Sequence, residues 1–422
     1  MNLPGRLQIP SDVLRIAESL EGAGFEAWCV GGAIRDTLLG ELNTDYDIAT
    51  SARPEEIQQL FRNTVPVGAR FGTIAVRVHR RFHEVTTFRR DVATDGRHAV
   101  VEFGASLEED LARRDFTVNA IAYHPLRHEW RDPWHGTTDL DARLIRAVGD
   151  PAQRFQEDYL RILRGLRFSA RFRFAIEPAT WAAMQAAADG LPRLSAERVR
   201  DEWFKGLRSA YSIRHLTELW LTSGSARVWI PELLASPEGS DGSAAMQDQA
   251  AGRHVGGLTS RRGVLPVLEV DRGDDDLRDP VLLTALLCID PVSVLVRLKA
   301  SNAEIARATG MVTGPEEPDS VAAMDVRRWM AAVDEAADDQ ARLWHLRHGA
   351  PPPWAAVMRG IRERGEPLTR KQLAVSGEDL REAGVAPGPA MGLLLDRLLA
   401  LVVDDPELNT RDTLLERARS LV

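Results

Sequence analysis

The stretch GGAIRDTLLG (31–40), followed closely by DYDIAT (45–50), decides how this chain is interpreted. The two glycines end the apolar run FEAWCV, which reads as a strand, and open a helix, so backbone N–H groups can approach a phosphate there. Arg35, one turn into the helix, can add a positive charge to the same anion. A glycine pair at a strand end also serves packing alone, so the pair needs support from the residues that follow.

The support comes from two aspartates in the second stretch. Asp45 and Asp47 are expected at positions i and i+2 of a strand, where their side chains share one face. Adjacent carboxylates repel unless a cation neutralises them, and such oxygen ligands suit Mg²⁺. An exposed polar strand face is the alternative. Together with the glycines and Arg35, the aspartates favour a metal–phosphate site for nucleotide chemistry.

A third carboxylate is expected from a neighbouring strand. Glu84, in FHEVTTF (82–88), is the candidate because its strand should pair beside the one that carries Asp45 and Asp47. An outward-facing glutamate on an edge strand is the alternative reading.

Composition sets broad limits on the class of protein. The chain has 422 residues, of which 44% are hydrophobic and 27% charged, which is typical of a soluble globular protein of two to four domains. It contains no run of eighteen apolar residues and no secretory signal, so we expect no membrane contact and a cytoplasmic location. The two cysteines, Cys29 and Cys288, cannot form a disulfide framework or a zinc site.

The charge balance is ambiguous about nucleic acid. The net charge is −9, yet arginine recurs densely between Arg77 and Arg208. A locally basic surface attracts phosphate even on an acidic protein. A generally arginine-rich composition with solvated helix faces explains the same pattern equally well.

The pattern of apolar residues predicts an α+β chain. A helix is expected up to Gly24, a second over 53–62, and a strand hairpin over 71–89, giving a small mixed sheet backed by helices. Residues 89–104, with an Asp-Gly turn, read as a mobile loop. From about residue 150 onward the pattern is helical, with a loop at 236–257 and a linker at 314–320.

The helix expected over QEDYLRILRGLRFSARF (156–172) is the most informative one. Asp158 and Arg161 lie off its apolar stripe, about 60° apart, and can pair side by side. Gly165 falls near them one turn later, although a glycine in mid-helix costs about 1 kcal/mol relative to alanine. The glycine therefore suggests room for a flat base, whereas an ordinary surface salt bridge is the alternative.

Four motifs together resemble one family. GGAIRD with DYD, RRDFTVNAIAY (113–123), EDYLRILRGLRF (157–168) and SAERVRDEW (195–203) are similar to the class II tRNA nucleotidyltransferases and bacterial poly(A) polymerases of the polymerase-β superfamily. The resemblance covers residues 28 to about 208. It implies a polymerase-β-like nucleotidyltransferase head (1–150) followed by an all-α neck (151–212), body (213–313) and tail (314–422).

The resemblance also implies roles for single residues. Asp45 and Asp47 would hold two Mg²⁺ ions, with Glu84 as the third catalytic carboxylate. Asp158 and Arg161 would act as a protein template, because an acceptor beside a donor matches cytosine and adenine and rejects guanine and uracil. The other nucleotide-binding residues would be Gly31, Gly32, Arg35, Arg114, Asp115, Asn119, Arg164 and Arg167. Arg167 is also expected to contact RNA or neighbouring helices.

The implied activity is template-independent addition of CCA to tRNA 3′ ends from CTP and ATP, with release of pyrophosphate. The segment PVGARFGTIAV (66–76) favours this over poly(A) synthesis, and the 89–104 loop is the one that helps relatives switch from C to A. Addition of the terminal A alone, poly(A) synthesis and an inactive RNA-binding protein remain alternatives. The expected partners are tRNA, CTP and ATP, with no protein partner and a monomeric or homodimeric state.

Overall fold

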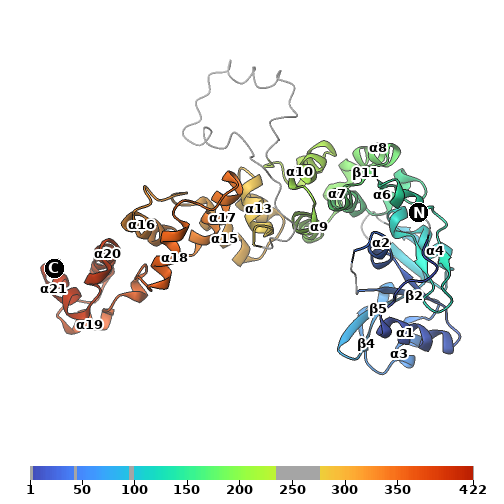
Figure 1. The fold of residues 1–422 in the computed structure, drawn as a ribbon, viewed down its shortest axis with the longest axis horizontal. Helices are drawn as coiled ribbons and strands as arrows, with labels where there is room; N and C mark the ends of the chain where they lie inside the picture. Colours follow the sequence, from blue (N-terminus) through green and yellow to red (C-terminus); the bar gives the residue numbers. More distant parts are fainter. Residues whose placement is uncertain (1–2, 42–44, 95–98, 234–275, 422) are drawn as a thin grey trace, which may run out of the picture. The chain divides into compact units, whose positions relative to one another are not determined.

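A computed structural model describes residues 3–41, 45–94, 99–233 and 276–421 (Figure 1). Its internal contacts divide the chain into unit 1, Met1–Pro231, and unit 2, Glu232–Val422. The predicted head and neck both lie in unit 1, together with residues 213–231, which the sequence had assigned to the body. The other domain bounds stay predictions. The predicted α+β class is confirmed, because all the long strands lie in the head and the rest is largely helical.

A seven-stranded mixed sheet forms the centre of the head. Its strand order is β3-β4-β5-β2-β1-β8-β9. β2 pairs with β5 in parallel, and the remaining neighbours are antiparallel. The strands are β1 (Ala27–Val30), β2 (Asp47–Thr50), β3 (Thr64–Gly68), β4 (Thr73–Val78), β5 (Arg81–Thr87), β8 (Ala122–Tyr123) and β9 (Trp130–Arg131).

Short helices pack against this sheet. α1 (Ser11–Gly22) contacts β1 and β2, and α3 (Pro54–Leu60) contacts β4 and β5. α1 buries Val13, Ile16 and Leu20 on one side, as its 3.6-residue periodicity requires. α2 (Gly32–Leu38) begins directly after β1. The predicted first helix, the helix that opens at the glycines and the β4–β5 hairpin are confirmed.

The sequence analysis was wrong about part of the head. Residues 89–104 are not an irregular loop: β6 (Arg89–Thr94) and β7 (Ala99–Phe103) pair as an antiparallel hairpin. The Asp-Gly turn predicted within that segment lies outside the described residues. β3, β8 and β9 were also missed, because β3 contains Pro66 between exposed valines and the other two strands have only two residues each. Tertiary pairing rather than local alternation defines these strands.

The neck follows as helices with short connections. The neck helices are α6 (Pro151–Glu157), α7 (Leu160–Phe172), α8 (Pro178–Ala186) and α9 (Ala196–Ser209), and unit 1 continues with α10 (Ile213–Thr222) and α11 (Ser225–Trp229). α7 packs against α9 and buries the predicted stripe, including Ile162, Leu163 and Leu166. α4 (Leu107–Ala112) connects the β6–β7 hairpin to the segment that carries RRDFTVNA.

Unit 2 is helical throughout its described regular structure. It comprises α13 (Pro280–Leu287), α14 (Pro291–Arg297), α15 (Asn302–Val312), α16 (Ala323–Val333), α17 (Ala337–His348), α18 (Ala355–Glu363), α19 (Gly377–Glu382), α20 (Pro389–Asp404) and α21 (Arg411–Leu421). Its apolar cores include one centred on Trp329 and Trp354 and another on Leu398 and Leu414. The predicted loop at 236–257 lies outside the described residues. Within the described chain, every helix is too short or too polar to cross a membrane.

Candidate functional site

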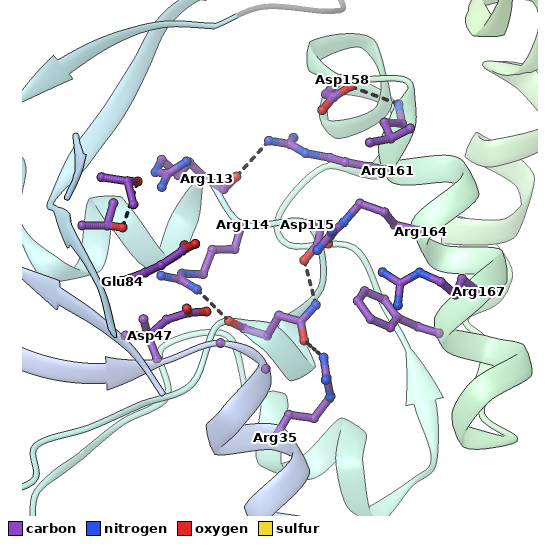
Figure 2. A pocket seen from close by; sticks show the side chains of 18 of the residues that line it. Arg35, Asp47, Glu84, Arg113, Arg114, Asp115, Asp158, Arg161, Arg164 and Arg167 are labelled. Carbon is purple, nitrogen blue, oxygen red and sulfur yellow. Dashed lines mark hydrogen bonds and ion pairs between the residues drawn. The ribbon is translucent and has the colours of Figure 1, made fainter. Parts of the chain in front are cut away.

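One pocket of about 590 Å³ collects most of the residues singled out from the sequence (Figure 2). This volume is ordinary for a site that binds a small molecule. The strands supply one side of the pocket and the neck helices the other. Of the predicted residues it includes Gly31, Gly32, Arg35, Asp47, Glu84, Arg114, Asp115, Asn119, Asp158, Arg161, Arg164 and Arg167. Asp45 is the one candidate that does not line it.

Asp47 and Glu84 form the acidic side of the pocket. The register Ile48↔Val85 between β2 and β5 makes Asp47 and Glu84 neighbours on adjacent strands, as predicted for the strand of Glu84. Burial raises the pKa of Asp47 to about 6, the negative charges of Glu84 and Asp45 add to the rise, and Arg114 opposes it. The two carboxylates therefore repel one another across the strand pair.

The placement of Asp45 differs from the prediction. β2 begins at Asp47, so Asp45 precedes the strand and is exposed. The i, i+2 argument holds only where both residues have extended pairing, and β1 pairs with β2 only from Asp47 onward. Asp45 acts on Asp47 through its charge.

The chemistry of this side fits a divalent cation. Carboxylate oxygens are the ligands that Mg²⁺ prefers, and a cation would relieve the repulsion that raises the pKa of Asp47. Among the described residues, no group of three or more histidine, cysteine or acidic side chains is gathered closely enough to form a complete metal site. Two neighbouring carboxylates, Asp47 and Glu84, fit Mg²⁺ that is bound together with substrate phosphates.

Gly31 leaves space for the guanidinium of Arg114 beside the carboxylate of Asp47. Its φ is +74°, a left-handed conformation that favours glycine. A Cβ at this position would lie 3.0 Å from a guanidinium nitrogen of Arg114 and 3.8 Å from a carboxylate oxygen of Asp47. The backbone at residue 31 therefore lies close to both the guanidinium of Arg114 and the carboxylate of Asp47.

Asp110 anchors the two arginines of the RRD segment. It is buried and forms ion pairs of 3.0 Å with both Arg113 and Arg114. They follow the C-terminus of α4, where positive charge is favourable. Both arginines line the pocket.

Arg35 is buried and held from several directions. It forms an ion pair of 2.6 Å with Asp36, donates a hydrogen bond to the side-chain oxygen of Asn119, and lies 4.6 Å from the ring centre of Phe172. Burial lowers the pKa of Arg35, and Asp36 partly restores it. Its position at the pocket is fixed by these contacts.

Charged pairs stabilise the helix side of the pocket, one between head and neck and one within the neck. Arg164 on α7 forms an ion pair of 2.7 Å with Asp115, and Arg167 forms one of 2.6 Å with Glu202 on α9. Burial by itself would raise the pKa of Asp115, but Arg164 and the Asn119 amide hold it well below the usual range. Arg167 thus contacts a neighbouring helix, one of its two predicted roles.

The predicted helix over 156–172 is interrupted at Asp158. α6 ends at Glu157 and α7 begins at Leu160, because Asp158 has extended backbone angles. The carboxylate of Asp158 accepts a hydrogen bond from the backbone N–H of Leu160, in the manner of an N-cap. The i, i+3 geometry assumed for Asp158 and Arg161 was therefore wrong.

The interactions of Asp158 and Arg161 reach other elements. Asp158 forms an ion pair of 2.8 Å with Arg198 on α9, and Arg161 forms one of 2.8 Å with Glu157. Arg161 also donates to the backbone carbonyl of Arg113 (Figure 2). Both residues line the pocket, although each is held by its own partner.

Gly165 does not leave room for a base. A Cβ there would lie 2.3 Å from Met184 and 2.8 Å from Phe116, both of which are buried. The glycine therefore permits close packing between α7 and its neighbours, away from the pocket. The prediction failed because helical spacing does not indicate which neighbour covers a given position.

Arg89, Arg198 and Glu202 are pocket or supporting residues that the sequence analysis did not single out. Arg198 and Glu202 stand four apart within SAERVRDEW, a spacing that suggests a pair within one helix. In the structure Arg198 instead pairs with Asp158, in the break between α6 and α7, and Glu202 pairs with Arg167 on α7. The four-residue spacing of Arg198 and Glu202 indicated that they form ion pairs, but it did not indicate with which residues.

Comparisons with known proteins match this architecture. A sequence model of the poly A polymerase head domain matches residues 27–146, and a model of a probable RNA- and SrmB-binding site of polymerase A matches residues 173–236. A CCA-adding enzyme of Levilactobacillus brevis is 34% identical over 416 residues, which cover 95% of each chain. One of Streptococcus mutans is 33% identical over 435 residues, covering 99% of this chain and 98% of that one.

Solved structures agree with the sequence matches. The crystal structure of the Bacillus stearothermophilus CCA-adding enzyme in complex with CTP superimposes with a TM-score of 0.75 at 31% identity, covering 97% of this chain and 98% of that chain. A Thermotoga maritima CCA-adding enzyme complexed with tRNA shares the fold, with a TM-score of 0.61 at 20% identity and coverage of 97% and 95%.

Proposed function

The chain belongs to the family of class II CCA-adding enzymes, and we propose that it builds the CCA sequence at tRNA 3′ ends from CTP and ATP, with release of pyrophosphate. One observation supports the proposal most strongly. The same pocket is lined by the mutually repelling carboxylates of Asp47 and Glu84 and by several arginine side chains. A nucleoside triphosphate needs both, because its phosphates require cations and its base requires directional donors and acceptors. We place this activity in the cytoplasm, in a monomer or homodimer.

The phosphate end of the nucleotide belongs beside the β1–α2 turn. There Gly31, Gly32, Arg35 and Arg114 line the pocket. Helix N-termini and arginines stabilise the charge of the triphosphate. Asp115 and Asn119 connect these arginines to the neck, so we assign them to the ribose and phosphate region.

Asp47, with Glu84 and Asp45, would hold two Mg²⁺ ions, since Asp47 and Glu84 are neighbours and Asp45 adds its charge. When bound, such ions lower the pKa of the attacking hydroxyl and stabilise charge during in-line displacement. The side chains themselves place the RNA 3′-hydroxyl against the acidic side while Arg114 faces the phosphates.

The base belongs beside the neck, where Asp158 offers acceptors and Arg161 offers donors. One oxygen of Asp158 accepts from Leu160 N–H and the other from Arg198, so each retains a lone pair. Cytosine and adenine both present an amine donor beside a ring-nitrogen acceptor, whereas guanine and uracil reverse that order. Arg198 holds the carboxylate of Asp158 in place, and Glu157 holds the guanidinium of Arg161. Arg164 also lines the pocket and adds a hydrogen-bond donor beside them.

A gel assay with three tRNA transcripts tests the proposal. The transcripts end before CCA, after the first C and after CC, and each receives CTP or ATP alone with Mg²⁺. We expect CTP incorporation on the first two transcripts and ATP incorporation on the third. Incorporation of ATP on the third transcript alone would indicate an A-adding enzyme, and long adenylate tails on every transcript would indicate a poly(A) polymerase.

A further inference from the structure

The sheet face that carries Glu84 continues beyond the pocket. The β4–β5 register pairs Thr73 with Thr86, Ala75 with Glu84, and Arg77 with Phe82. Successive pairs of this alternating set lie on one face, about 7 Å apart along the strands. Thr73 and Thr86 line the pocket, so the sequence of pairs leads from the pocket, past Glu84, to Arg77 and Phe82.

Arg77 and Phe82, which we call the outer strip, are both exposed. Phe82 is 52% exposed, and the guanidinium of Arg77 lies 5.9 Å from the centre of its ring. On the neighbouring strand β3, Val65 lies opposite Ala75 and is 44% exposed. Phe82 and Val65 therefore expose apolar side chains on the sheet face that leads to the pocket.

The arginine of the outer strip differs from those inside the pocket. Arg35, Arg164 and Arg167 each form a short ion pair with an acidic residue. Arg77 forms none with any residue that the structure describes. The charge of Arg77 is therefore available to an external anion.

We propose that the outer strip binds the single-stranded 3′ end of the RNA as it enters the pocket. A base of the terminal nucleotides stacks on Phe82, and Arg77 contacts the adjoining phosphate. An aromatic ring beside a cation is the usual means of holding single-stranded nucleic acid. This inference rests on the proposed function, because that function requires the 3′-hydroxyl to reach Asp47 and Glu84. The unpaired arginine favours a polyanion over a second copy of the chain as the occupant.

Steady-state kinetics with the full-length protein test the outer strip. The variants are Phe82→Ala, Phe82→Tyr and Arg77→Ala. Arg81→Ala is the matched control, because Arg81 is an exposed arginine one residue from Phe82 whose partner is Val78, on the opposite face. We expect Phe82→Ala to raise the KM for tRNA lacking CCA about tenfold, the size of one lost stacking contact. Phe82→Tyr should stay near wild type, and Arg77→Ala should weaken tRNA binding more than Arg81→Ala.

Two further measurements separate this role from a general structural effect. Calorimetric binding of CTP without RNA should be unchanged in Phe82→Ala. A 2-aminopurine placed at the RNA 3′ end should lose fluorescence on binding to the wild type, and less so on binding to Phe82→Ala. An unchanged KM for tRNA in Phe82→Ala, or equal losses in Arg77→Ala and Arg81→Ala, would overturn the inference. A wild-type protein that incorporates no nucleotide would instead refute the proposed function.

Discussion

The two sides of the pocket differ in whether their charges are balanced by the protein. On the sheet side, Asp47 and Glu84 lie side by side, and burial with repulsion raises the pKa of Asp47 to about 6. On the neck side, each acidic residue has an arginine partner, such as Asp115 with Arg164 and Glu202 with Arg167. In our proposal a divalent cation balances the first side, whereas the charges of the second side are already balanced by the protein.

Removing the unbalanced charge should have the largest effect. We expect Asp47→Asn to lower the rate of CTP incorporation by about a thousandfold or more, because the remaining carboxylates cannot hold the cations in place. Binding of tRNA, measured by filter retention, should stay within a few-fold of wild type. Loss of tRNA binding together with activity would instead show that Asp47 is structural.

A change on the balanced side should alter selectivity before rate. Asp158→Ala removes the acceptor that distinguishes cytosine from uracil, so the preference for CTP over UTP should fall by about 10- to 100-fold. Competition between the two nucleotides in one incorporation reaction measures this ratio. Asp158→Asn is the control for the cap, because its amide oxygen can still accept from Leu160 N–H. Unchanged preference in Asp158→Ala would refute the templating role.

Packing behind the neck side can be tested without touching the pocket. Gly165→Ala should destabilise the protein by about 1–3 kcal/mol, because the added methyl meets Met184 and Phe116. Gly22→Ala, near the end of α1 with nothing within 4 Å, is the matched control and should be neutral. Urea unfolding measures both. If Gly165→Ala weakened CTP binding without loss of stability, the glycine would face the nucleotide after all.

The raised pKa of Asp47 gives the sheet side a pH dependence. A proton competes with a cation for this carboxylate below pH about 6, so Mg²⁺ affinity should rise with pH up to that value and then level off. Below it, we expect affinity to fall about tenfold per pH unit, measured by calorimetry without nucleotide. Without metal, the free energy of unfolding should fall as pH rises from 3.8, the ordinary pKa of aspartate, to about 6, because the folded protein disfavours the ionised form of Asp47. A flat profile between pH 5 and 7 would argue against Asp47 as a ligand.

The residue types at the site could be predicted from the sequence, because their chemistry depends on local motifs. Gly31 and Arg35 lie at the turn after β1 and in α2, and Asp47 begins the next strand, which pairs with β1 so that Asp47 lies opposite Val30. Glu84 could be predicted because alternation identified its strand. Two failures concern neighbours distant in sequence: Asp158 pairs with Arg198, and Gly165 packs against Phe116. The hairpin at 89–103 was missed although its two strands are adjacent in sequence.

By itself, the sequence determined the α+β class, the helical region after residue 150 and the set of side chains able to bind a nucleotide, since periodicity and motif spacing are local properties. Only the tertiary structure decided which charges are paired. Arg198 and Glu202 on α9 hold Asp158 and Arg167, while Asp47 and Glu84 meet without a partner between them. The reason is physical. An ion pair forms where the fold brings two charged groups within about 4 Å, and the spacing of residues along the sequence does not specify that distance.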